Sequence, residues 1–150
     1  MKHFEDFRVG ETGVLGAHTI TEEEIVAFGK KYDPQPFHTD PEAAKATLFG
    51  GLIASGWHTC AIMMRLSAEA MRRAQEAATG SPGVDSCRWL KPVRPGDTLT
   101  LRREVLETWP SRSKPYGFVR TRAEMLNQRG EVVLRLVGVG MVRRRPGEAS

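Results

Sequence analysis

The sequence predicts an α+β domain in which an antiparallel sheet packs against one long helix. Helix-like apolar periodicity dominates residues 22–78, whereas apolar and polar residues alternate in the part that follows. Because helices and strands are grouped along the chain, the pattern favours an antiparallel sheet over repeated β-α-β units. A chain of 150 residues with 40% hydrophobic residues can bury one core, so we expect a single domain over 1–150.

The first expected elements are a strand near 12–19 and a helix that begins after Thr21. Thr21 can cap this helix, and Glu24 occupies the capping-box position three residues later. The apolar side of the helix continues to about Lys31. A short helix is then expected over 41–47, where a proline stands at the first helical position.

The longest helix is expected from about residue 55 to residue 78. It begins inside the apolar stretch 48–64, which is shorter than the roughly 20 residues that a membrane span needs. A buried core helix is therefore the better interpretation of this stretch. From Arg65 onward the pattern becomes amphipathic, and the Gly-Ser-Pro-Gly segment at 80–83 is expected to end the helix.

Four strands are expected to complete the sheet. Apolar and polar residues alternate with a period of two over 117–127, which is typical of a half-buried strand, and turns bound the other three strands. Turn-forming residues separate them at 92–97 and 127–130. The expected strands are 84–90, 98–109, 117–127 and 131–143.

The charge of the chain is +4, with a pI near 9.4. A basic surplus favours an anionic partner, either nucleic acid or a phosphorylated small molecule. The excess lies late in the chain, at Arg102-Arg103, Arg112, Lys114, Arg120, Arg122 and Arg143-Arg144-Arg145.

The two cysteines, Cys60 and Cys87, are too few for a disulfide scaffold. Cys60 lies in an apolar run, which favours a buried free thiol. The first residues contain no apolar stretch of the kind found in signal peptides. We therefore expect a cytoplasmic protein.

The residues most suggestive of chemistry are Asp33 and His38, which two prolines separate in the segment Tyr32–Asp40. An α-helix would place the two side chains about 140° apart. A fully extended chain would hold them more than about 10 Å apart. They can cooperate only if a stiff loop curls, and such a pair before a buried helix predicts an active site.

Gly56 is the second candidate, at the expected start of the long helix. The first amides of a helix lack intrahelical partners and lie at the positive end of its dipole. Such a donor can stabilise a carbonyl oxygen that gains negative charge, and glycine lets a substrate approach the backbone. The alternative is that Gly56 only permits tight packing of the helix.

Three blocks of the sequence resemble the MaoC-like dehydratases, which include the (R)-specific enoyl-CoA hydratases. The similarity extends over roughly residues 4–143 and implies a hot-dog fold, with the sheet wrapped around a central helix. It also implies reversible hydration of an enoyl-CoA to a 3-hydroxyacyl-CoA, without a cofactor or a metal ion. The blocks are Tyr32-Asp33-x-Gln35-Pro36-Phe37-His38, Gly51-Leu52-Ile53-Ala54-Ser55-Gly56 and Leu90-Lys91-Pro92-Val93-Arg94-Pro95-Gly96-Asp97.

The resemblance implies that Asp33 and His38 hold one water, as acid and base in an order that stays open. It implies that the Gly56 amide polarises the thioester carbonyl. The expected substrate-binding residues are Gln35, Phe37, Ser55, Trp57, Arg88, Lys91 and Arg94, with Arg112 and Lys114 as further candidates for the CoA phosphates.

Three positions depart from the family pattern within these blocks. Tyr32 stands where the family often has glycine, Gln35 stands where it often has asparagine, and Ser55 stands where many members have histidine. These departures leave the substrate and its positioning open. The expected partners are an acyl-CoA and a second copy of the chain, because domains of this fold commonly pair as dimers; neither nucleic acid nor a membrane is expected.

Two alternatives to a hydratase stay open from the sequence. A hot-dog thioesterase would share the fold and the CoA partner, but such enzymes generally use a carboxylate on or near the central helix. None occurs between Leu52 and Met64. A non-catalytic acyl-CoA-binding module would have no need of both Asp33 and His38.

Overall fold

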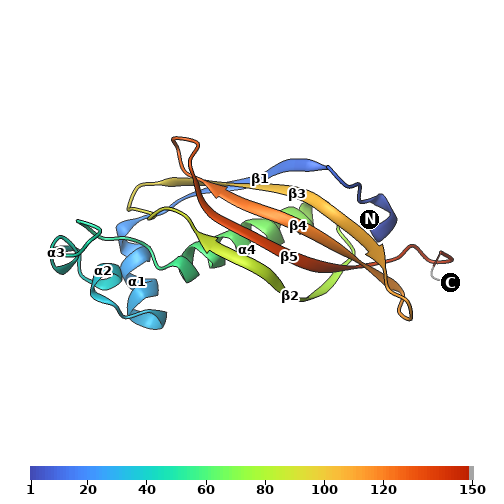
Figure 1. Ribbon diagram of the computed structural model, residues 1–150, viewed down its shortest axis with the longest axis horizontal. Coiled ribbons are helices and arrows are strands. Elements are labelled where there is room, and N and C mark those ends of the chain that lie inside the picture. The colour runs from blue at the N-terminus through green and yellow to red at the C-terminus, as the bar shows by residue number, and fades with distance from the viewer. Residues whose placement is uncertain (149–150) are drawn as a thin grey trace.

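The computed structural model describes residues 1–148, in which five antiparallel strands form one curved sheet along a long helix (Figure 1). The strand order is β1-β3-β4-β5-β2, so β1 and β2 are the two edges. The strands are β1 (Thr12–Thr19), β2 (Ala78–Trp89), β3 (Thr98–Pro110), β4 (Tyr116–Leu126) and β5 (Val132–Arg143).

Helix α4 (Gly56–Arg73) runs along the inner face of the sheet. Its buried side chains, which include Ile62, Met63 and Leu66, join buried residues of β3, β4 and β5, such as Leu101, Met125 and Leu134, in the main apolar core. Burial of this kind drives the packing of a helix on a sheet. This is the α+β, hot-dog arrangement that the sequence predicts. None of the helices within 1–148 is long and apolar enough to cross a membrane.

Three short elements gather at one end of the sheet, and the two chain termini lie at the other end (Figure 1). These elements are α1 (Glu22–Tyr32), α2 (Pro36–Thr39) and α3 (Pro41–Ala44); one 3₁₀ turn, η1 (Phe4–Asp6), precedes β1. Helix α3 is shorter than the expected helix over 41–47. Helix α2 was not expected.

The predicted start of α1 is confirmed in detail. The Thr21 hydroxyl accepts a hydrogen bond from the Glu24 amide at 3.2 Å, and the Glu24 carboxylate accepts one from the Thr21 amide at 2.8 Å. This capping box fixes the first turn of α1. The helix ends at Tyr32, and Asp33 is its C-cap. The position of Asp33 is therefore fixed by the end of α1.

The predicted end of the long helix near residue 78 is wrong, because α4 stops at Arg73. Gln75 adopts a left-handed conformation with φ of 50°. Its amide donates to the Arg72 carbonyl, and the Glu76 amide donates to the Met71 carbonyl. These two bonds form a Schellman motif, which usually places glycine where Gln75 stands. The sequence therefore lacks the usual stop signal.

Replacing Gln75 with glycine is expected to raise the free energy of unfolding by about 1 kcal/mol, because a side chain at positive φ costs about that much. Gln75→Ala is the matched control, since alanine keeps the same backbone strain and gains nothing. Chemical denaturation of the two variants measures the difference. Equal stabilities would show that Gln75 is not strained.

The Gly-Ser-Pro-Gly segment at 80–83 lies inside β2 instead of ending a helix. Strand β2 pairs only with β5, and its register shifts between Ala78 and Val84. A proline has no N–H to donate, so it is tolerated at an edge strand or a bulge. The Ser81 hydroxyl donates to the Val139 carbonyl at 2.5 Å, which holds the irregular segment on the sheet.

Both cysteines are free thiols, and Cys60, predicted as a buried free thiol, is partly buried. Cys60 on α4 lies with its sulfur 3.8 Å from the sulfur of Cys87 on β2. Burial, together with the neighbouring Cys87 thiol, raises the pKa of Cys60 to about 12. Cys60 is therefore a neutral side chain that packs against the core.

Candidate active site

The segment between α1 and α2 curls so that Asp33 and His38 meet. Pro36 begins α2 at its first turn, where its fixed φ suits a helix. One turn of helix then carries His38 back toward the end of α1. The distance from Asp33 Oδ2 to His38 Nε2 is 3.2 Å. The curl that the sequence required is therefore present, and its physical form is the unexpected helix α2.

Two close contacts hold this curl in place. A Cβ at Gly29 would lie 2.6 Å from the His38 carbonyl oxygen, so only glycine allows α2 to pack this tightly on α1. On the other side, the Ile53 amide donates to the Phe37 carbonyl at 2.9 Å. His38 is fixed between α1 and the segment that leads into α4.

The orientation of the buried His38 ring follows from its second nitrogen. Nδ1 lies 2.8 Å from the Ile53 carbonyl oxygen. A carbonyl can only accept, so Nδ1 carries the hydrogen in this bond. Nε2 is thereby directed toward Asp33 and is free to accept a proton when the ring is neutral.

The Asp33 carboxylate receives a separate hydrogen bond on each oxygen. Gln35 Nε2 donates to Oδ1 at 2.7 Å, and Ser55 Oγ donates to Oδ2 at 2.7 Å. Partial burial alone would raise the pKa of Asp33. The bonds from Gln35 and Ser55 and the proximity of His38 outweigh burial, and the pKa lies below its ordinary value. Asp33 is an ionised carboxylate near neutral pH.

A pocket of about 380 Å³ opens beside this pair. The walls come from α1–α2, the start of α4, the end of β2 and the segment after it. Apolar side chains dominate the lining, and few polar groups face inward, as is usual in small-molecule sites. The lining residues are Asp33, Phe37, His38, Phe49, Ile53, Ala54, Gly56, Trp57, Thr59, Trp89, Leu90, Lys91, Pro92, Val93 and Val133.

Gly56 begins α4 at the wall of this pocket. Within residues 1–148, the amides of Gly56 and Trp57 have no hydrogen-bond acceptor, as is usual for the first turn of a helix. A Cβ at Gly56 would lie 2.4 Å from Nε1 of Trp89. Trp89 was not among the expected site residues, because no local pattern in the sequence links the end of β2 to the start of α4.

The expected substrate-binding residues fall into two groups. Phe37, Trp57 and Lys91 line the pocket. Gln35 and Ser55 instead contact Asp33 and are not part of the lining.

The basic residues expected to contact the CoA phosphates lie at different distances from the pocket. Lys91 forms an ion pair with Glu131, and Arg94 Nη2 donates to the Phe49 carbonyl at 2.6 Å. Arg88 is exposed on β2, outside the pocket lining. The hairpin between β3 and β4, which carries Arg112 and Lys114, lies at the end of the sheet far from α1–α3 (Figure 1). Within this chain, these last two are therefore remote from the pocket.

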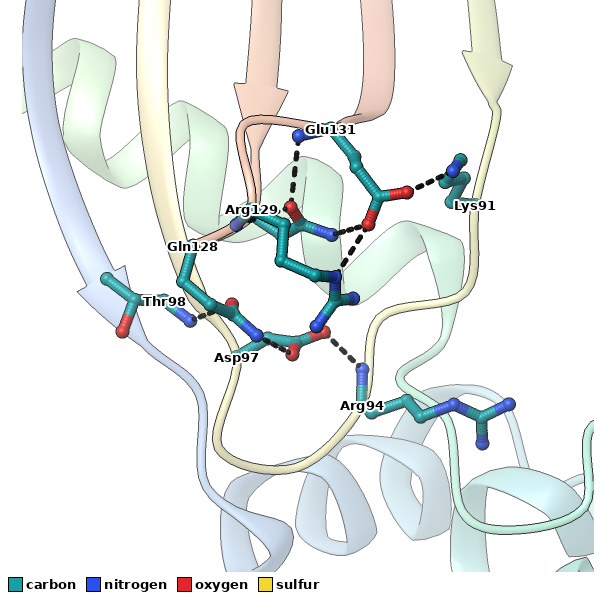
Figure 2. A network of polar contacts seen from close by, with 8 residues as sticks. Lys91, Arg94, Asp97, Thr98, Gln128, Arg129 and Glu131 are labelled. Carbon is teal, nitrogen blue, oxygen red and sulfur yellow. Dashed lines mark hydrogen bonds and ion pairs between the residues drawn. The ribbon is translucent and has the colours of Figure 1, made fainter.

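The segment from Leu90 to Asp97 forms part of the pocket wall, and polar contacts with the turn between β4 and β5 hold it in place (Figure 2). Asp97 accepts from the Arg94 amide and from Gln128 Nε2, each at 2.9 Å. Glu131 accepts from Lys91, Asn127 and Arg129, and these bonds lower its pKa to about 2. The turn between β4 and β5 thus fixes the segment that supplies Leu90, Lys91, Pro92 and Val93 to the pocket.

Most of the late basic surplus is paired within the chain. The partner carboxylates lie on other strands, on the segment between α4 and β2, or near the N-terminus, so these arginines offer less free charge than the sequence indicated. The ion pairs are Arg102–Glu124, Arg103–Glu76, Arg120–Asp85, Arg120–Glu107, Arg122–Glu104, Arg144–Glu5 and Arg145–Asp6. No group of three His, Cys, Asp or Glu side chains that could hold a metal ion occurs within 1–148.

Comparison with known proteins places this arrangement in a family. The MaoC like domain model matches residues 9–125. A solved MaoC-like dehydratase from Rhodospirillum rubrum is 43% identical, with a TM-score of 0.89 and coverage of 97% of this chain and 99% of that one. The (R)-specific enoyl-CoA hydratase of Rhodospirillum rubrum is 32% identical over 117 residues, which are 75% of each protein.

A longer relative is the mesaconyl-CoA hydratase of Cereibacter sphaeroides. It is 31% identical over 146 residues, which are 96% of this chain but 42% of that protein. The chain therefore spans less than half the length of this relative. With the family model matched over most of its length, the chain belongs to the MaoC-like domain family.

Proposed function

We propose that this protein catalyses the reversible hydration of an enoyl-CoA to a 3-hydroxyacyl-CoA. The observation that carries the proposal is that two features open into one pocket. These are the Asp33–His38 pair and the unpartnered amides at the start of α4. The hydratase names of the relatives support the same class of reaction.

In the proposed reaction, Asp33 and His38 hold the attacking water. With Nδ1 bonded to the Ile53 carbonyl, neutral His38 offers Nε2 as an acceptor, and the ionised Asp33 is an acceptor too. A water between them donates one hydrogen to each. Its oxygen adds to Cβ of the enoyl group while the pair takes one proton and returns one to Cα. The pair ends as it began, and the reaction needs no cofactor.

The start of α4 supplies the second requirement, which is stabilisation of negative charge on the thioester oxygen. The Gly56 amide is the proposed donor, with the helix dipole behind it. Polarisation of the carbonyl makes Cβ electrophilic and stabilises the enolate before Cα is protonated. Phe37 and Trp57 are the proposed contacts of the acyl group and the pantetheine arm.

The CoA phosphates need cations near the pocket mouth. Lys91 lines the pocket, but its ammonium group also forms an ion pair with Glu131. Arg88 is exposed and has no ion pair within residues 1–148. We propose Arg88 and Lys91 as the phosphate contacts, with Arg94 as a support of the pocket wall.

A thioesterase is not favoured by this geometry. Asp33 is the one carboxylate that lines the pocket within the described chain. The acid on α4, Glu69, pairs with Arg65 on the helix surface. The pocket therefore has no separate carboxylate to activate a water against the thioester carbonyl.

The proposal is tested by assaying the purified protein against crotonyl, longer, branched and carboxylated enoyl-CoAs. Loss of the enoyl absorbance without release of free CoA is the expected result for at least one of them. Release of free CoA would instead identify a thioesterase. An acyl-CoA that co-purifies, with no turnover of the panel, would identify a binding module.

We also propose that the chain assembles as a homodimer. Exposed apolar side chains lie on α4 and on the edge strand β2, namely Trp57 (62% exposed), Met64, Val84 and Trp89 (45% exposed), and the ring centroids of Trp57 and Trp89 are 5.0 Å apart. Exposed apolar patches of this kind mark interaction sites, and a free strand edge can pair with a second copy. Sedimentation is expected to give twice the 16.7 kDa chain mass. A single monomeric species at micromolar concentration would contradict the dimer.

A further inference from the structure

Ser55 stands at the N-cap of α4 but does not cap the helix. A serine in this position usually accepts a hydrogen bond from an amide two or three residues later. Here the side chain makes no such bond. The hydroxyl instead donates to Asp33 Oδ2 at 2.7 Å, across 22 positions of sequence.

The surroundings of Ser55 exclude a direct role in substrate contact. The residue is 1% exposed and does not line the pocket. Ser55 precedes α4 and contacts the Asp33 carboxylate, but it is separated from the pocket by the lining residues. The same oxygen of Asp33 that receives this bond faces His38 Nε2 at 3.2 Å. Ser55 therefore fixes the oxygen that points at the imidazole.

The choice of partner has a second consequence at the helix. Because Ser55 does not cap α4, the Trp57 amide two residues later remains without an acceptor in the described chain, beside the Gly56 amide, which an N-cap side chain does not reach and which also has none. Gly56 and Trp57, which carry these amides, both line the pocket. One side chain thus connects the carboxylate of the pair to the helix terminus that lines the pocket.

We infer that Ser55 is a positioning residue that holds the Asp33 carboxylate toward His38 and leaves the Trp57 amide uncapped beside the Gly56 amide at the start of α4. This inference rests on the proposed hydratase function. It differs from the expectation that Ser55 binds substrate. The distinction is measurable, because a positioning residue affects kcat and the titration of Asp33, whereas a substrate contact affects KM.

Three variants test the inference. Ser55→Ala removes the donor, and Ser55→Thr keeps a hydroxyl at the same atom. Thr21→Ala is the matched control, since Thr21 is a genuine cap, on α1, and its hydroxyl accepts from Glu24 instead of contacting Asp33. Thermal unfolding of each variant checks that the fold is retained.

The expected result for Ser55→Ala is a kcat about 10- to 100-fold lower, with KM changed less than about threefold. Loss of a donor destabilises the ionised carboxylate, so Asp33 takes up its proton at a higher pH. The acidic limb of the kcat profile should move upward by about one pH unit. Ser55→Thr should restore most of kcat, and Thr21→Ala should leave the profile unchanged.

A second readout separates this inference from the proposed function. Carbon NMR of the Asp33 carboxyl group follows its titration without any substrate. Its midpoint is expected to rise by about one pH unit in Ser55→Ala and to stay constant in Thr21→Ala. An unchanged Asp33 titration, or a raised KM with unaltered kcat, would overturn the positioning role. Absence of turnover in the wild-type protein would overturn the hydratase proposal alone.

Discussion

Substitution of Asp33 by asparagine is expected to lower kcat for hydration by roughly 10²- to 10⁴-fold, the usual contribution of a general acid–base group. Asparagine preserves the size of the side chain and can still bond to Gln35, but it cannot accept a proton. His38→Ala is expected to have an effect of the same size. Hydration of the best enoyl-CoA from the panel, followed by absorbance, measures both.

The two variants differ in their effect on stability. His38 is 5% exposed, and its removal leaves the Ile53 carbonyl without a donor, which costs about 1–3 kcal/mol. Asp33→Asn removes a carboxylate whose pKa is lowered by folding. That carboxylate contributes stability above its unfolded pKa, and the contribution is lost as the pH falls through the lower folded value.

Asp40→Asn is the matched control for Asp33→Asn. Asp40 follows the same short helix, where it caps α3 through bonds from the Glu42 and Ala43 amides. Asparagine is an equally good cap, so activity and stability should stay close to those of the wild type. Near wild-type turnover by Asp33→Asn or His38→Ala would show that the pair is not the catalytic centre.

Replacement of Gly56 by alanine is expected to lower kcat/KM by about 100-fold. The new Cβ would lie 2.4 Å from Nε1 of Trp89, so the indole or the helix start must shift. Displacements of about 1 Å at a reacting site can cost that much. Stability should change little, because alanine favours helix by up to about 1 kcal/mol, which offsets part of the repacking.

The double variant Gly56→Ala/Trp89→Ala distinguishes two reasons for this glycine. Removing the indole gives the new methyl group room. If the substrate oxygen must approach the Gly56 amide, as proposed, the double variant stays at least about tenfold below Trp89→Ala alone. Equal activity of the two would mean that Gly56 serves only to pack Trp89, the alternative that the sequence left open.

Local patterns predicted much of the fold. The capping box at Thr21 and Glu24 specifies where α1 begins, and two-residue alternation specifies β4 to within one residue at each end. These signals succeed because caps and sheet faces depend on residues close together in the chain. The prediction of where α4 ends was wrong because it relied on the same local signals. Gln75 gives no local sign of the left-handed turn that tertiary contacts hold.

The sequence by itself determined that a carboxylate, an imidazole and a helix-starting glycine occur in the order and context of a MaoC-like domain. Only the tertiary structure decided how they meet. The bond from Ser55 to Asp33 and the indole of Trp89 against Gly56 join residues on separate elements. Such contacts depend on how α4 lies against the sheet, and no spacing along the chain encodes them.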